Sequence, residues 1–375
     1  MKRYFDYNAT CPMLDVSLQA FSHIAQQASG NASSMHWAGR AARRALDDAR
    51  DVLATHLNVE SSSLVFTSGG SEANNMAIYG CLSQAKPGKV ISSTIEHPSV
   101  LQTLQHWCAH FGHELCLVQP NSQGLIDSAR FYDLFDEHVV MVTLMWANNE
   151  TGVIQPVHVL ARACRERGIP VLVDGVQALG KLDVDVSELD ADFISFSAHK
   201  IGGPKGVGAL VIRRGASLEP WLLGGGQERG RRSGTENVPA VAGFAAALGV
   251  LNYAQAAPVR DFFEITLKEA MPDVTVYGEH VERVGNTSMF TVPGVDGETL
   301  LMQLDLAGFA VASGSACSSG KREPSHVLRA MGVDERAARS SLRVSFGLEH
   351  DDEDAKALVH ELVRIRSLLK RMSGR

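Results

Sequence analysis

The segment Phe66–Asn75, with the sequence FTSGGSEANN, places small polar residues between a buried strand and a helix. Gly70 and Ser71 stand where the helix begins, so free N–H groups and the positive end of the helix dipole face whatever lies there. This arrangement suits a phosphate group. An ordinary helix cap has the same Ser-Gly-Gly-Ser pattern, so the segment by itself leaves both interpretations open.

Two other strands end in ionisable side chains. Val171–Gln177, VLVDGVQ, places Asp174 at the end of an apolar strand, where a buried carboxylate needs a donor or a cation beside it; a helix cap or a solvated loop is the plain alternative. Phe193–Lys200, FISFSAHK, ends in Lys200 before a glycine-rich turn. A lysine there is either a surface residue or, when partly desolvated, an amine of lowered pKa that forms Schiff bases.

Together the three segments match what pyridoxal phosphate requires of a protein. A phosphate cradle, an acid that keeps the pyridine nitrogen protonated and a lysine for covalent attachment are the groups that hold and tune this cofactor. The combination resembles the fold-type I, aspartate-aminotransferase-like superfamily, in its class V branch. The resemblance implies an α/β fold in which a large domain with a mostly parallel sheet binds the cofactor and a smaller α+β domain accompanies it.

The segment Ser313–Ser325, SGSACSSGKREPS, surrounds Cys317 with serine and glycine. Structural cysteines usually lie among apolar neighbours, although an inert loop cysteine is the plain alternative here. Together with the HVLRAMG that follows, the segment resembles the active-site loop of NifS-like (group I) cysteine desulfurases. These enzymes take sulfur from L-cysteine as a persulfide on the loop cysteine and release L-alanine.

The resemblance extends along nearly the whole chain. Each matching motif is short, but their common order in one chain leaves little room for coincidence. The further matching segments are FDYNAT at Phe5–Thr10, GNASSMH at Gly30–His36, EHPSV at Glu96–Val100, ANNETG at Ala147–Gly152, GGGQERGRRSGTEN at Gly224–Asn237 and SLRVSFG at Ser341–Gly347.

The resemblance implies roles for the catalytic and substrate-binding residues. Lys200 would attach the cofactor, Cys317 would accept the sulfur, and His97 would stack on the cofactor ring and handle protons. Arg343, with help from Asn31, would bind the substrate carboxylate, since a planar guanidinium gives bidentate geometry.

A larger set of residues would hold the cofactor. Asp174 would pair with the pyridine nitrogen, while Asn149 and Gln177 would contact the side of the ring that carries the 3-oxygen. The family also implies a homodimer, in which Thr235 would contact the phosphate from the second subunit. The implied cofactor-binding residues are Gly70, Ser71, His97, Asn149, Asp174, Gln177, Ser197, His199, Lys200 and Thr235.

Several functions stay open at this point. A related lyase acting on selenocysteine or cysteine conjugates, or a class V aminotransferase, would keep the same core and leave Cys317 a bystander. A non-catalytic scaffold would have no physical reason to keep Lys200 and Cys317 together. The sulfur acceptor would be an iron–sulfur scaffold, a tRNA-thiolation relay or another sulfuration pathway. Because the segment after the last helix is short, it stays open whether an iron–sulfur scaffold docks there. Any role of Cys11 also stays open.

Short apolar runs that alternate with helical periodicity must position these residues. The alternation predicts a mostly parallel sheet with helices on both faces. The predicted strands are Ser63–Thr67, Lys89–Ser92, Glu114–Val118, Val139–Leu144, Val171–Asp174, Phe193–Phe196 and Val207–Ile212. The predicted helices between them include Ala38–Leu57, Ser71–Leu82, Ser99–Phe111 and Val157–Gly168.

After Tyr253 the pattern changes to helices and antiparallel-type strands, as in an α+β domain. We therefore expect a large cofactor-binding domain at residues 12–252, and a small domain made of residues 1–11 and 253–375. The predicted elements of the small domain are helices at Val259–Met271, Gly297–Ala307 and Asp352–Met372, with strands at Thr275–Tyr277, Thr287–Val292, Ala310–Ala312 and Ser341–Phe346.

Composition limits the class of protein. With 375 residues, 45% of them hydrophobic and 21% charged, the chain is typical of globular proteins, not of disordered ones or coiled coils. The formal charge of -7 argues against nucleic acid or an anionic membrane as the main partner. Asn237–Val259 lacks charge, but its prolines and its Ala/Gly content favour a buried helix from about Pro239 to Tyr253 over a membrane span. The polar N-terminus and six sparse cysteines predict reduced thiols in the cytoplasm.

Overall fold

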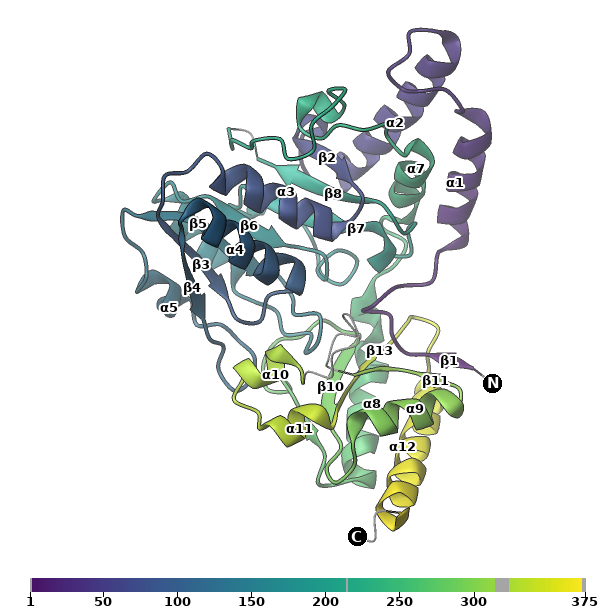
Figure 1. The fold of residues 1–375 in the computed structure, drawn as a ribbon. Helices are drawn as coiled ribbons and strands as arrows, with labels where there is room; N and C mark the ends of the chain where they lie inside the picture. Colours follow the sequence, from purple (N-terminus) through teal and green to yellow (C-terminus); the bar gives the residue numbers. More distant parts are fainter. Residues whose placement is uncertain (1, 214, 314–323, 373–375) are drawn as a thin grey trace.

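The chain folds around one large sheet and two smaller ones, which occupy the upper and lower parts of Figure 1. The computed structural model describes residues 2–213, 215–313 and 324–372. Cys317 lies outside the described residues. The N-terminal strand lies in the lower part of the molecule, beside the C-terminal half of the chain (Figure 1).

The large sheet has seven strands, most of which run parallel to one another. Strand β8 is antiparallel to both of its neighbours, and all other pairs are parallel. This confirms the predicted α/β class with a mostly parallel sheet. The strand order is β2 (Leu64–Thr67), β8 (Gly208–Ile212), β7 (Phe193–Ser197), β6 (Val171–Asp174), β5 (Val139–Met145), β3 (Lys89–Ser93) and β4 (Glu114–Val118).

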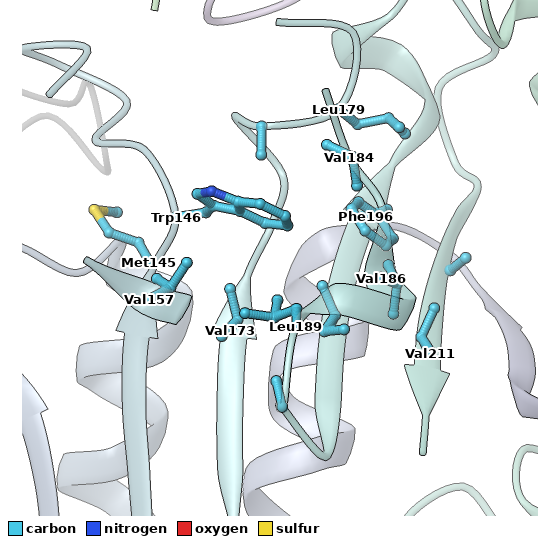
Figure 2. Close-up of a cluster of buried hydrophobic side chains, with 14 of the residues drawn as sticks. Met145, Trp146, Val157, Val173, Leu179, Val184, Val186, Leu189, Phe196 and Val211 are labelled. Atoms are coloured by element: carbon cyan, nitrogen blue, oxygen red, sulfur yellow. The ribbon is translucent and has the colours of Figure 1, made fainter. Parts of the chain in front are cut away.

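Helices cover both faces of this sheet because its strands are apolar on both sides. Ile194 and Val211 join one buried cluster, whereas the preceding residues Phe193 and Leu210 join another. Successive side chains of a strand point to opposite faces, so each face is buried under its own helices. The first cluster is covered by α2 (Trp37–His56), α6 (Val157–Arg165) and α7 (Val238–Ala247), the second by α3 (Gly70–Leu82) and α4 (Pro98–Phe111). Figure 2 shows part of the first cluster.

Two further helices complete this half of the molecule. Helix α1 (Asp15–Gln27), for which the sequence analysis made no prediction, packs on α7. The short α5 (Ser128–Tyr132) packs on α6.

Most of the remaining elements surround a separate apolar core, to which Phe5 also belongs, whereas Leu328 and Ala338 join the first cluster. A four-stranded antiparallel sheet has the order β12 (Ala312–Ser313), β13 (Ser341–Ser345), β10 (Thr287–Thr291), β9 (Thr275–Val276). Strand β1 (Arg3–Tyr4) pairs in parallel with β11 (Phe309–Ala310). The helices are α8 (Ala257–Ala270), α9 (Gly297–Leu306), α10 (His326–Ala330), α11 (Glu335–Arg339) and α12 (Asp352–Met372). The division at residues 12–252 stays a prediction.

The buried helix predicted from about Pro239 to Tyr253 is shorter than expected. Helix α7 ends at Ala247, because Leu248 is extended and Gly249 has a left-handed φ of 69°. Among the described residues, none of the helices combines the length and the apolar character that crossing a membrane would require.

Candidate active site

Most of the predicted site residues lie where strands of the large sheet end. Strand β6 ends in Asp174, β7 ends in Ser197 and is followed by a 3₁₀ turn at Ala198–Lys200, and β2 leads into α3 at Gly70. Parallel strands bring their carboxyl ends to one edge, which is where open α/β sheets bind ligands. The sequence order of the motifs thus becomes a cluster in space.

A cavity of about 470 Å³ lies at this edge, within the usual size range of small-molecule sites. It contains ten of the residues predicted from the family, together with side chains from the N-terminal segment, α9 and β12. The predicted residues that line it are Gly70, Ser71, His97, Asn149, Asp174, Gln177, Ser197, His199, Lys200 and Arg343.

Lys200 is partly buried, and its amine is held by backbone oxygens of the N-terminal segment. Its Nζ donates to the carbonyl oxygens of Asn8 at 2.6 Å and Ala9 at 3.0 Å. Burial lowers the pKa of Lys200 to about 8, and the nearby guanidinium of Arg343 acts in the same direction. An amine in this range is partly neutral at neutral pH and can act as a nucleophile or a base.

Asp174 and His97 are connected by a chain of hydrogen bonds. Oδ2 of Asp174 accepts from Nδ2 of Asn74 at 2.8 Å, and the same nitrogen donates to Oγ of Ser99 at 3.0 Å. Ser99 Oγ lies 2.8 Å from Nδ1 of His97. The backbone N–H of Ser99 also donates to this Nδ1, at 3.1 Å. A backbone N–H can only donate, so the neutral imidazole carries its proton on Nε2.

The charge state of His97 follows from its surroundings. Burial lowers the pKa of His97, while the carboxylate of Asp174 opposes the shift and the charges of Lys200 and His326 add to it. The ring is therefore neutral at pH 7. A neutral ring of this tautomer can deliver the proton of Nε2, on the side away from Ser99, and can take one up there afterwards.

Arg343, on β13, is held by an acid that the sequence analysis did not single out. Its Nη2 forms an ion pair with Oδ1 of Asp6 at 2.6 Å, and its Nη1 donates to the backbone oxygen of Asn149 at 2.8 Å. Its Nε is buried without a hydrogen-bond partner among the described residues. Arg343 is thus placed in the cavity with donor capacity left for an anionic ligand.

The start of α3 and the end of β7 form the most suitable place for an anion. Gly70 and Ser71 open the helix, and Ser197 and His199 line the cavity with them. A side chain at position 70 would bring its Cβ within 2.5 Å of Cγ2 of Val176, so only glycine lets α3 begin this close to the loop after β6. Burial lowers the pKa of His199 to about 4, which leaves this ring neutral.

Three predicted residues are not placed in this cavity. Asn31 and Thr235 are exposed and do not line it, and the side chain of Asn31 instead accepts from the N–H of Ser33 at 2.8 Å. Cys317 lies outside the described residues. The roles predicted for these residues stay predictions.

Sequence reasoning missed several residues that the fold brings into or beside the site. Asp6 and Asn8 belong to the FDYNAT segment, Asn74 to the SEANN segment, and Ser99 to the EHPSV segment, so each lies within a motif that was quoted without assigning it a role. Lys181, 2% exposed, lies outside those motifs, and only its tertiary contacts reveal it.

Comparisons with known proteins agree with the site. The aminotransferase class-V family model matches residues 3–358. The protein named cysteine desulfurase IscS of Dictyoglomus turgidum is 37% identical, with 100% of this chain and 97% of the relative covered.

Solved structures agree as well. A structure titled NifS-like protein superimposes with a TM-score of 0.91 and 32% identity, covering 98% of this chain and 100% of that one. Another, titled SspA in complex with cysteine, has a TM-score of 0.83 and 31% identity, covering 92% and 99%. The chain therefore belongs to the class V aminotransferase family and, within it, to the NifS-like cysteine desulfurases.

Proposed function

We propose that this protein uses pyridoxal phosphate to convert L-cysteine into L-alanine and to transfer the sulfur to Cys317 as a persulfide. The observation that carries the proposal is the partly buried amine of Lys200, with its lowered pKa, in one cavity with Asp174 and Arg343. A similar protein, SspA, has been solved in complex with cysteine, which supports this substrate.

The donor set of the cavity fits this cofactor. Gly70, Ser71, Ser197 and His199 would hold the phosphate, and Asp174 would face the pyridine nitrogen. Oδ1 of Asn149 is buried in the cavity lining without a hydrogen-bond partner among the described residues. This is expected of a polar atom whose partner is a bound ligand. When bound, pyridoxal phosphate acts as an electron sink that stabilises negative charge on the substrate carbon.

Lys200 and His97 would move the protons. With a pKa of about 8, roughly a tenth of the Lys200 amines are neutral at pH 7, enough for a base to take a proton from the substrate α-carbon. His97, neutral and protonated on Nε2, would exchange a proton on the other side of the site.

Arg343 would bind the substrate carboxylate. Its guanidinium already forms an ion pair with Asp6, so a carboxylate must share the guanidinium with Asp6 or displace it. The unpartnered Nε provides one additional donor for this contact.

Cys317 would complete the reaction. Its thiol and L-cysteine give L-alanine and a Cys317 persulfide, so one sulfur moves and all atoms balance. The persulfide would then pass to an acceptor protein, either an iron–sulfur scaffold or a carrier of another sulfuration pathway. We propose the cytoplasm as the compartment, because Cys317 must begin each cycle as a thiol.

The test uses L-cysteine labelled with ³⁵S and the purified full chain. We expect one alanine per sulfur transferred and label on the peptide that contains Cys317. Cys317→Ser should keep the cofactor absorbance and lose the protein-bound label, whereas Cys116→Ser, on β4, should keep both. An unchanged label in Cys317→Ser would overturn the role of this cysteine.

The role of Lys200 is tested by reduction with borohydride. In the wild type, the reduced cofactor should become linked to the peptide that contains Lys200. Lys200→Ala should lose this link. A covalent link that persists at another lysine would contradict the assignment.

A further inference from the structure

A second lysine, Lys181, is buried directly behind the cavity. It is 2% exposed and does not line the cavity. Burial, together with the charges of Lys200 and Arg343, holds the pKa of Lys181 well below its usual range. Burying an amine is costly unless its hydrogen bonds are satisfied, so the fold depends on the partners of Lys181 to offset this cost.

The two partners of Lys181 are both amide oxygens. Its Nζ donates to Oδ1 of Asn8 and to Oε1 of Gln177, each at 2.5 Å. A lysine amine donates through N–H in both of its protonation states. The protonated amine has no lone pair with which to accept a hydrogen bond, so the amide of Gln177 must turn its oxygen toward Lys181.

The amide nitrogen of Gln177 must then point the other way. Its Nε2 donates to the backbone oxygen of Asn8 at 3.0 Å. The same oxygen accepts from Nζ of Lys200 at 2.6 Å. An amide nitrogen has two N–H groups, so one serves Asn8 and the second is left for an acceptor in the cavity that Gln177 lines.

We propose that Lys181 is a positioning residue, which holds the Gln177 amide in the orientation that presents its N–H groups to the bound cofactor and to the carbonyl that also anchors Lys200. This inference rests on the proposed function, and on the role that the family resemblance implies for Gln177, contact with the side of the cofactor ring that carries the 3-oxygen. Without Lys181, the amide of Gln177 could rotate and present its oxygen to an oxygen of the cofactor, which would repel it.

The test compares four variants of the full chain by equilibrium dialysis of pyridoxal phosphate. Lys181→Met should raise the dissociation constant about tenfold, the effect of losing one oriented hydrogen bond. Gln177→Met should have a similar effect, and the double variant should be no weaker than Gln177→Met alone, because the two residues act as one unit. Lys268→Met, on the surface of α8, should bind the cofactor like the wild type.

A conservative variant and the melting temperature separate positioning from stability. Lys181→Gln keeps an N–H donor at this position and should recover part of the affinity. A lower melting temperature in Lys181→Met with unchanged cofactor affinity would overturn the proposal, and so would additive effects in the double variant.

A cofactor-free measurement keeps this test distinct from that of the proposed function. If the wild type binds no pyridoxal phosphate, the proposed function fails. Crystal structures of cofactor-free wild type and Lys181→Met still decide the positioning role: Gln177 should lose its contact with the Asn8 carbonyl in the variant. An unchanged Gln177 side chain would overturn the proposal.

Discussion

The pKa of the buried Glu96 carboxyl depends on the groups that surround it. It is completely buried beside His97, where its Oε1 accepts from the hydroxyl of Ser93 at 2.6 Å and from the N–H of Met145 at 2.9 Å. Its Oε2 has no partner among the described residues. Burial raises the pKa of Glu96 to about 8, against the effect of the two hydrogen bonds. The carboxyl is therefore mostly protonated at neutral pH.

A pH-dependent stability follows from this protonation. Between its ordinary pKa of 4.5 and about 8, the folded protein holds a proton on Glu96 that the unfolded chain releases. The contribution of Glu96 is thus fully present below pH 4.5, falls as the pH rises and levels off above about 8. The loss is at most about 1.4 kcal/mol per pH unit.

Glu96→Gln, which cannot ionise, should remove this part of the pH dependence. The free energy of unfolding, measured with urea from pH 5 to pH 8, should fall more steeply for the wild type than for the variant. Glu137→Gln, on the surface, serves as the control and should follow the wild type. Parallel profiles for the wild type and Glu96→Gln would show that Glu96 titrates normally.

At the scale of elements, the site depends on how three separate elements meet. Asp174 ends β6, Asn74 lies in α3, and His97 caps the N-terminus of α4. Helices α3 and α4 pack on the same face of the sheet, and Asn74 bridges them to β6. Through Asn74, the orientation of the acid is coupled to that of the imidazole.

Asn74→Leu should break this coupling while filling a similar volume. A hydrogen bond to a charged group contributes about 1.5–3 kcal/mol, so we expect alanine formation to slow roughly tenfold to a hundredfold. Asn75→Leu is the matched control, because Asn75 is half-buried and donates only to the backbone oxygen of Ser71, at 2.9 Å, within the described residues. Turnover within a factor of two of the wild type in Asn74→Leu would contradict the coupling.

At the scale of the whole molecule, large apolar side chains remain exposed around the start of α2 and in the loop before α7. Met35, Trp37 and Leu223 are 91%, 75% and 77% exposed. The same loop is anchored to α2 by a buried ion pair between Arg50 and Glu228, at 2.7 Å. Figure 1 shows this loop and α2 together in the upper part of the molecule. Large exposed apolar side chains of this kind are typical of surfaces that bind another protein chain.

We propose that a second copy of the chain covers this surface, as the predicted role of Thr235 requires. Trp37→Asp combined with Leu223→Asp should shift the protein from dimer to monomer in sedimentation experiments, because burying the two carboxylates would be costly. Ile265→Asp changes an exposed apolar residue of α8 and should leave the dimer intact. A wild type that sediments as a monomer would contradict the proposal.

Many of the helices and strands can be predicted from the sequence because the pattern of apolar residues that specifies each of them is local. Runs such as Val171–Asp174 are apolar on both faces, which is the pattern of a strand buried between helices, and the structure places a strand at these residues. Most element ends differ by one to three residues, since caps and turns decide them, and the one strand predicted at Ala310–Ala312 is two short strands, β11 and β12. Helix α7 ended early for this reason, at the left-handed Gly249.

Within the site, the order of residues along the chain establishes which chemical groups are present and which strand ends carry them. Asp174 and Lys200 could be predicted because Asp174 ends an apolar strand and Lys200 lies in the turn after another. The side chains and backbone oxygens around them become known only once the chain is folded. Asn8, from the N-terminal segment, meets Lys200 and Lys181 across more than 170 residues of chain, and Asp6 pairs with Arg343 across 337. Such contacts arise from packing between distant segments, so no local pattern reports them.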